Sequence, residues 1–201
     1  MYKIIDIKQN SPEWHKYRRS HIGASDAPII IGSSPYKSGN DLWREKMGYV
    51  EPPKMTDRMK RGHDLEPEAR KIAEEHFEMS FEPKVFESLQ NNFLSASVDG
   101  ATKCNTGLLE IKCPGEENHN WALKGNVMDY YQHQIQHQLM ITGAKRCIYM
   151  SYRPESNDPV KFIFISPDEN LWSMMMAKYM IFWNHILMGK EFEPPMKFDR
   201  Y

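Results

Sequence analysis

Apolar and polar residues alternate along several short stretches of the chain, which is the pattern of strands that bury one face. The sequence predicts strands over residues 81–89, 92–98, 108–112, 146–152 and 160–165, with residues 3–7 as an edge strand. The turn Pro154–Pro159 separates the last two of these strands, and Pro114 closes the strand at 108–112. These segments supply the strands of one sheet.

Capping residues and helical periodicity mark the remaining elements. Ser11-Pro12-Glu13 opens a first helix, small residues precede a second through Ile29–Ile31, and Gly48 stops a brief helix over Asp41–Met47. Longer helices are expected over residues 64–79, 116–126 (a helix with a loop), 128–142 and 167–188. This order predicts an α/β fold, a three-layer α/β/α arrangement around a mixed sheet, with residues 1–201 forming a single domain.

Two of these helices have particular features. In the helix over residues 64–79, Asp64 is the predicted cap and Pro67 lies in the first turn. The last helix carries methionines and aromatic residues on more than one side, and a tail containing Phe192 and Phe198 follows it. The width of that apolar surface predicts burial against the sheet of the same chain or against another subunit, and we expect the tail to be exposed.

Composition and charge limit the classes of protein to consider. The chain of 201 residues, 40% hydrophobic and 26% charged, resembles an ordinary globular protein. It has no apolar run of about 18 residues and no cleavable apolar leader, so we do not expect a membrane or exported protein. Cys104, Cys113 and Cys147 are scattered, which favours a reducing compartment over a disulfide framework. Because the net charge is −1, a DNA enzyme of this composition must gather its cations on one face or enclose its substrate.

Candidate chemistry is concentrated in residues 97–114. Asp99 follows one strand, and Glu110 and Lys112 share one face of the next, so a hairpin would place Asp99 beside Glu110. Neighbouring carboxylates repel each other unless a cation lies between them, and their oxygens suit Mg²⁺. Lys112 would then orient or deprotonate a water on that metal, as in a metal-dependent phosphodiesterase. The alternative is an exposed hairpin whose charged side chains serve solubility.

Two further sets of polar residues each allow a functional and a purely structural interpretation. Ser25 lies at the start of the second helix, where with Arg18 it could bind a phosphate or could simply cap the helix. Glu66 edges the buried stripe of its helix, so its carboxylate needs a partner. That partner is either a metal-bound water or Arg70, one turn further along the helix.

Several short motifs occur along the chain in one order. They are Trp14-His15-Lys16-Tyr17-Arg18, Gly23-Ala24-Ser25-Asp26, Gly62…Glu66, Asp99-Gly100, Glu110-Ile111-Lys112-Cys113-Pro114 and Gln134-Ile135-Gln136. Together they resemble the family of bacteriophage lambda exonuclease and the YqaJ-type viral recombinases, within the PD-(D/E)XK nuclease superfamily. The resemblance extends from Trp14 to Thr142. Val98 stands where the superfamily has proline, at a position that is structural rather than liganding.

The resemblance implies a metal site. Asp99, Glu110 and the backbone carbonyl of Ile111 would bind Mg²⁺, and Glu66 would hold a second ion directly or through water. Two ions are expected, with Mn²⁺ as a possible substitute. These acids would also be catalytic, because two cations stabilise the attacking and the leaving oxygen.

The same resemblance assigns roles to the remaining matched residues. Lys112 would position and activate the attacking water, and Gln134 would hydrogen-bond within the site. Arg18 and Ser25 would hold the 5′-phosphate of the strand that is digested.

The fold implied by the family is a restriction-endonuclease-like core. The implied activity is a Mg²⁺-dependent 5′→3′ exonuclease that digests one strand of linear double-stranded DNA and leaves 3′ single strands for annealing recombination. The implied partners are DNA ends, a single-strand annealing protein and further copies in a ring-shaped homotrimer, with no membrane, in the cytoplasm of a bacterial host that carries a phage or prophage. Two alternatives stay open: a structure-specific endonuclease with the same site, and a non-catalytic DNA-end-binding accessory protein.

Overall fold

A six-stranded mixed sheet forms the centre of the protein, whose computed structural model describes residues 1–192. The strands are β1 (Tyr2–Ile5), β2 (Glu82–Ser88), β3 (Ser95–Ala101), β4 (Gly107–Lys112), β5 (Arg146–Tyr152) and β6 (Val160–Ile165). They follow one another across the sheet in chain order, and every neighbouring pair is antiparallel except β4 and β5. The predicted mixed sheet is confirmed, and β1 is an edge strand.

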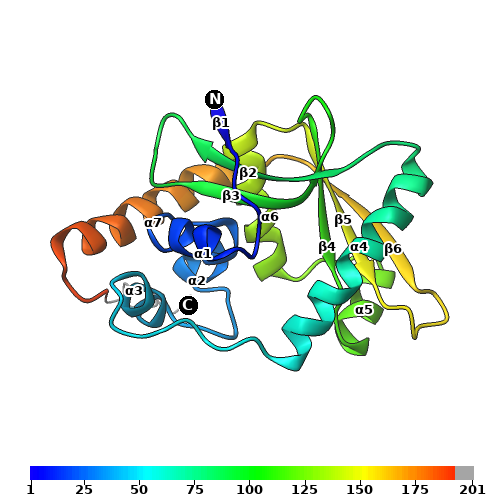
Figure 1. Ribbon diagram of the computed structural model, residues 1–201, viewed down its shortest axis with the longest axis horizontal. Helices are drawn as coiled ribbons and strands as arrows, with labels where there is room; N and C mark the ends of the chain where they lie inside the picture. The colour runs from blue at the N-terminus through cyan, green and yellow to red at the C-terminus, as the bar shows by residue number, and fades with distance from the viewer. Residues whose placement is uncertain (193–201) are drawn as a thin grey trace, which may run out of the picture.

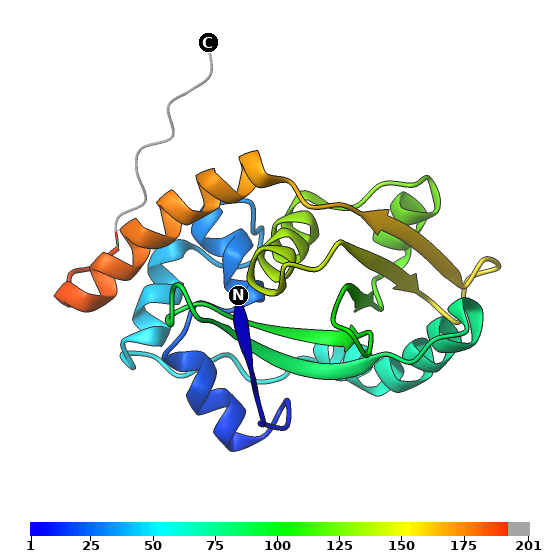
Figure 2. The same cartoon turned by 90° about the horizontal axis from the view of Figure 1, so that it is seen from above.

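Helices cover both faces of this sheet (Figure 1, Figure 2). They are α1 (Pro12–Arg19), the 3₁₀ turn η1 (Ala24–Asp26), α2 (Ala27–Ile31), α3 (Gly39–Lys46), α4 (Asp57–Phe77), α5 (Glu116–Leu123), α6 (Asp129–Thr142) and α7 (Glu169–Met188). Because side chains alternate along β4, Leu109 and Ile111 pack in one cluster with Ala69 of α4, whereas Leu108 joins the core around Ile135 of α6. The α/β fold with a helical layer on each side of the sheet is confirmed.

The parallel pairing of β4 with β5 determines where α6 lies. Parallel neighbours need a crossover connection, and residues 113–145 supply it through α5 and α6. Gly143 ends α6 in the left-handed conformation, with φ of 65°, so the chain turns back into β5. As a result α6 lies over the face of β4 that carries Glu110.

Helix α4 begins earlier than the sequence pattern predicts. It starts at Asp57, with the Thr56 hydroxyl accepting a hydrogen bond from the Met59 N–H at 3.3 Å, so the predicted cap Asp64 and Pro67 both lie inside the helix. The first two turns are largely exposed and polar. They therefore lack the apolar stripe on which a helix prediction depends.

The end of the described chain corrects a second prediction. Phe192 is only 3% exposed, and its ring centroid lies 5.0 Å from that of Phe182 on α7. Gly39 makes room for it, because a Cβ at that position would lie 2.4 Å from the Phe192 ring. Phe198 lies outside the described residues.

One side of α7 packs on the core and another side is exposed. Met175, Tyr179 and Phe182 are fully buried, so the helix covers the core of its own chain. Large apolar side chains on α7 are nevertheless at least one-third exposed: Met174, Met180, Ile181, Leu187 and Met188. Even so, among residues 1–192 no helix combines the length and the apolar character needed to cross a membrane.

Candidate functional site

Two acidic side chains meet where β3 pairs with β4. The register joins Gly100 to Leu109, so Asp99 lies beside Glu110, as the predicted hairpin requires. Asp99 Oδ2 accepts a hydrogen bond from the Ile111 N–H at 2.7 Å. Gly100 allows the Phe81 side chain to pack closely against β3, because a Cβ at position 100 would lie 2.6 Å from Cβ of Phe81. Burial and then the charge of Glu110 raise the pKa of Asp99 well above its ordinary value.

Glu110 is the centre of a buried polar cluster. Glu110 is only 1% exposed, and its carboxylate accepts hydrogen bonds from the Nε2 atoms of Gln134 and Gln138, each at 2.6 Å. Lys112 forms a short ion pair with the same carboxylate. Burial opposes the charge on Lys112, but the carboxylates of Glu110 and Asp99 outweigh it and raise the lysine pKa. In this arrangement the two carboxylates favour the ammonium form of Lys112.

Gln138, one turn after Gln134 on α6, is a further residue of this site that the sequence analysis did not identify. Its amide is fully buried, and Nε2 also approaches the Ser97 carbonyl oxygen at 3.2 Å, while Oε1 has no hydrogen-bond partner among the described residues. The spacing from Gln134 was a signal, because residues four apart project from the same side of a helix. What the spacing could not give is the identity of the shared partner, Glu110.

Glu66 lies at the rim of the site, on α4. Its carboxylate makes a short ion pair with Arg70, which is one of the two partners considered from the sequence. Arg70 Nε also donates to the backbone carbonyl of Asp99 at 2.8 Å, so the helix is tied to the strand that carries the acid. The charge of Glu66 contributes, after burial and Glu110, to the raised pKa of Asp99.

The acids suit a hard divalent cation by their chemistry. Asp99 and Glu110 offer carboxylate oxygens on adjacent strands, and the raised pKa of Asp99 reflects negative charge that a cation would neutralise. Within residues 1–192, however, no three or more His, Cys, Asp or Glu side chains are grouped as a metal site. The liganding roles of Asp99, Glu110, Glu66 and the Ile111 carbonyl therefore stay predictions.

Arg18 and Ser25 form a second group. The Arg18 guanidinium donates to Ser25 Oγ at 2.6 Å and lies over the ring of Trp14, 4.6 Å from its centroid. Trp14 is buried, and its indole N–H donates to Ser97 Oγ at 2.9 Å, which fixes α1 against β3. Ser25 lies inside η1 and caps no helix, because Gly23 is the N-cap residue of η1. The capping interpretation of Ser25 is therefore wrong.

A buried ion pair supports this second group. Lys46 Nζ lies 2.8 Å from Asp26 Oδ2, and Asp26 Oδ2 also accepts from the Gly23 N–H at 2.9 Å. Burial alone would raise the pKa of Asp26, but the charges of Lys46 and then Arg18 outweigh it and lower that pKa. Two cations and one carboxylate leave one net positive charge beside the Ser25 hydroxyl. No sequence pattern indicates the Asp26–Lys46 pair.

The two groups open onto one cleft of about 200 Å³. Its walls come from α1, η1, α4, β3 and α6, and among the residues that line it are Arg18, Ser25, Glu66, Asp99 and Gln134. Residues that the sequence predicts for phosphate binding and for catalysis thus face the same space. Glu110 and Lys112 are not among the residues that line the cleft, but Glu110 is hydrogen-bonded to Gln134 and lies beside Asp99, which both line it.

Comparisons with known proteins match most of the chain to one family model. Residues 13–145 match the model of the YqaJ-like viral recombinase domain. The uncharacterized protein YqaJ of Bacillus subtilis is 29% identical over 186 residues, which cover 88% of this chain and 56% of that protein. The chain thus spans about half the length of this relative.

Solved structures agree on the fold. The alkaline exonuclease LHK-Exo from Laribacter hongkongensis matches with a TM-score of 0.79 and 23% identity, over 89% of this chain and 94% of that chain. A phage-related exonuclease from Haemophilus somnus 129PT matches with a TM-score of 0.65 and 12% identity, over 84% and 95% of the two chains. At these identities the likeness establishes the fold.

Proposed function

This chain belongs to the YqaJ-like viral recombinase domain family, and on that basis we propose that it is a metal-dependent deoxyribonuclease. The proposed reaction digests one strand of linear double-stranded DNA from its 5′ end and leaves 3′ single strands for annealing recombination. The observation that carries the proposal is the single cleft, in which Arg18 and Ser25 face Asp99, Glu66 and Gln134. A terminal phosphate and a neighbouring phosphodiester could be held there together.

The carboxylates of Asp99, Glu110 and Glu66, with the Ile111 carbonyl, are the groups that would hold Mg²⁺, as two ions, or Mn²⁺ in its place. The bound cations supply Lewis-acid stabilisation of the attacking and leaving oxygens. The chain itself keeps Glu110 in position with the Gln134 and Gln138 amides, each at 2.6 Å.

Lys112 contributes a fixed positive charge to the proposed reaction. Its ammonium group lies between the Glu110 carboxylate and the ring of Tyr131, whose centroid is 5.1 Å from Nζ. From there it can donate a hydrogen bond to a phosphate oxygen or to the attacking water. We assign it a positioning and charge-stabilising role in the proposed reaction.

Arg18 and Ser25 support the proposed direction of digestion. A terminal 5′-phosphate carries more charge than an internal phosphodiester, and Arg18 can bind it with charge-assisted hydrogen bonds. The end that Arg18 and Ser25 hold is then the end that enters the catalytic group. This contact separates the proposed exonuclease from a structure-specific endonuclease with the same acids.

Assembly and partners complete the proposal. A chain with net charge −1 gains little from overall attraction to DNA, and a ring would retain its substrate by enclosure. The exposed apolar side chains of α7 offer one of the two patches that a cyclic homotrimer requires. We propose a single-strand annealing protein as the recipient of the 3′ strand, in the cytoplasm of a bacterial host.

One assay tests the activity. Linear duplexes labelled at the 5′ or the 3′ end are incubated with Mg²⁺ or with EDTA, and covalently closed circular DNA serves as the control. We expect Mg²⁺-dependent loss of the 5′ label as mononucleotides, intact circles, and no digestion by Asp99→Asn. Cutting of circles or flaps would identify the endonuclease, and binding of ends without digestion would identify the accessory protein.

A further inference from the structure

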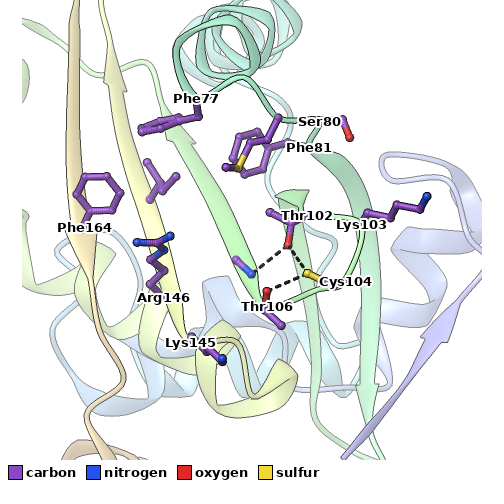
Figure 3. Close-up of a pocket in the computed structure, with 13 residues that line it drawn as sticks. Phe77, Ser80, Phe81, Thr102, Lys103, Cys104, Thr106, Lys145, Arg146 and Phe164 are labelled. Carbon is purple, nitrogen blue, oxygen red and sulfur yellow. Dashed lines mark hydrogen bonds between the residues drawn. The ribbon is translucent and has the colours of Figure 1, made fainter.

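A second and larger hollow lies at the opposite end of β4 from the catalytic acids. Its volume is about 940 Å³, and it opens where α4 ends at Phe77 and leaves the sheet uncovered (Figure 3). The β3–β4 turn and the start of β5 form much of its wall. The hollow lies on the α4 side of the sheet, because Ile148 and Phe81 belong to the α4 cluster.

Aromatic rings line one side of this hollow. The rings of Phe77 and Phe164 meet edge to face with centroids 5.9 Å apart, and Phe81 lies nearby at the start of β2 (Figure 3). Phe164 is 57% exposed, although it lies on a strand of the central sheet. An exposed ring beside a hollow of this size can stack on a flat ligand.

Positive charge surrounds the same hollow. Lys103, Lys145 and Arg146 line it and are exposed, and no Asp or Glu is among the residues that line it. Within the part of the chain that the structure describes, none of the three forms an ion pair. The Arg146 guanidinium lies 5.8 Å from the ring centroid of Phe164, so ring and cation act at one place.

We propose that this hollow binds a single-stranded stretch of DNA, with bases stacked on Phe164 and phosphates on Arg146, Lys145 and Lys103. Stacking on an aromatic side chain requires an unpaired base, because a duplex hides the faces of its bases. The three cations come from two separate segments around the hollow. Such spacing suits a DNA backbone, which presents a phosphate at every nucleotide. An acidic peptide would supply charge, but it offers a flat face only where it carries an aromatic side chain, whereas every nucleotide of a single strand carries a base that can stack.

The hollow and the catalytic acid Glu110 lie at different places along β4. Gly107 of β4 borders the hollow, whereas Glu110 lies three positions later and its side chain is directed to the other face of the sheet. The proposal rests on the proposed function, because digestion of one strand leaves its complement unpaired. Substitutions at Arg146 or Phe164 leave the catalytic residues untouched.

Cys104 provides a reporter inside the hollow. It is an exposed free thiol, whereas Cys113 is half-buried and Cys147 is buried. A hydrogen bond with the Thr106 hydroxyl lowers the pKa of Cys104 to about 7, so the thiol reacts readily near neutral pH. A bound strand would shield Cys104 sterically, and its phosphates would disfavour the thiolate.

The experiment measures alkylation of Cys104 by iodoacetamide in EDTA, read by peptide mass spectrometry. An oligothymidylate of about 20 nucleotides, saturating by fluorescence anisotropy, should slow the reaction about tenfold. A blunt duplex of the same length and a glutamate-rich peptide containing phenylalanine should not. An unchanged Cys104 rate with the oligonucleotide bound would overturn the proposal, and so would equal protection by the duplex or protection by the peptide alone.

Variants give an independent reading. Arg146→Glu and Phe164→Ser should each weaken oligothymidylate binding about tenfold. Lys190→Glu, which changes the net charge equally beyond the end of α7, should bind like the parent protein. Parental affinity in both pocket variants would overturn the proposal. Mg²⁺-dependent digestion of a short duplex is measured with the same preparations. If the parent protein shows no digestion, the proposed function is refuted, whereas the Cys104 protection experiment tests separately whether the hollow binds single-stranded DNA.

Discussion

The Arg18 contact gives the sharpest test of how the proposed nuclease would select a DNA end. Replacing Arg18 by alanine removes the guanidinium that donates to Ser25 at 2.6 Å and lies 3.9 Å from Asp26. We expect the parent protein to digest duplexes with a 5′-phosphate faster than duplexes with a 5′-hydroxyl. Arg18→Ala should lose most of that preference, because the positive charge beside the cleft is removed.

The expected size of the effect follows from exposure. A hydrogen bond to a charged group is worth about 1.5–3 kcal/mol. The Arg18 side chain is 33% exposed, so solvent screening places the contact near the lower end of that range. About 1.5 kcal/mol corresponds to about a tenfold change in the ratio of rates on the two ends.

Arg19 provides the matched control, because it neighbours Arg18 in the sequence but pairs elsewhere. Its guanidinium lies 3.4 Å from Glu51, and its side chain is 44% exposed. Initial rates of digestion on both duplexes, under conditions limited by kcat/KM, give the ratio for the parent, Arg18→Ala and Arg19→Ala. If Arg18→Ala keeps the parental ratio, or if Arg19→Ala loses it equally, Arg18 does not select the 5′-phosphate end.

Three further predictions concern the core of the site, stability and assembly. Gln138→Leu should lower the rate of digestion about 10- to 100-fold and raise the Mg²⁺ concentration required, because Glu110 loses a buried amide donor. The control variant Gln132→Leu should change neither quantity, and equal effects of the two variants would refute the role of Gln138. Burial lowers the pKa of His137 to about 4. Between about pH 6.5 and 4 the histidine is therefore protonated in the unfolded chain and neutral in the folded chain, so the free energy of unfolding should fall by about 3 kcal/mol over that range. Urea unfolding at a series of pH values should show that this dependence of the free energy of unfolding on pH disappears in His137→Gln, and an unchanged dependence would contradict the prediction. Leu187→Glu should reduce the mass in light scattering from trimer to monomer, because that side chain is 69% exposed on the apolar side of α7, and a monomeric parent would exclude the ring.

Local signals in the sequence suffice for most elements of the fold. β5 and β6 coincide with the predicted segments 146–152 and 160–165, because strict alternation and flanking turns leave little freedom in register. Helix α6 ends at Thr142 as predicted, where Gly143 takes the left-handed conformation. The early start of α4 escaped prediction because its exposed first turns carry no periodic apolar signal.

Contacts between distant segments explain what the sequence could not provide. Lys46 of α3 reaches Asp26 and the backbone carbonyl of Arg18, and no local pattern around residue 46 indicates either partner. Phe192 is buried because a glycine on α3 leaves space for its ring. The hairpin of Asp99 and Glu110 could be predicted because both strands are adjacent in the chain, so their register follows from a short turn.

The charges around Asp99 and around Arg18 differ, and the proposed function would use a metal cation at the first place and not at the second. Asp99 has a raised pKa because burial and the charges of Glu110 and Glu66 outweigh the attraction of Lys112. A DNA phosphate brought to this point would add further negative charge and raise that pKa again. A divalent cation held by Asp99 and Glu110 would reverse the potential that the phosphate meets. Arg18, whose neighbouring carboxylate is already neutralised by Lys46, can attract a phosphate unaided. Under the proposed function the chain would therefore grip a DNA end through its own charges, whereas cutting next to Asp99 would require a metal ion.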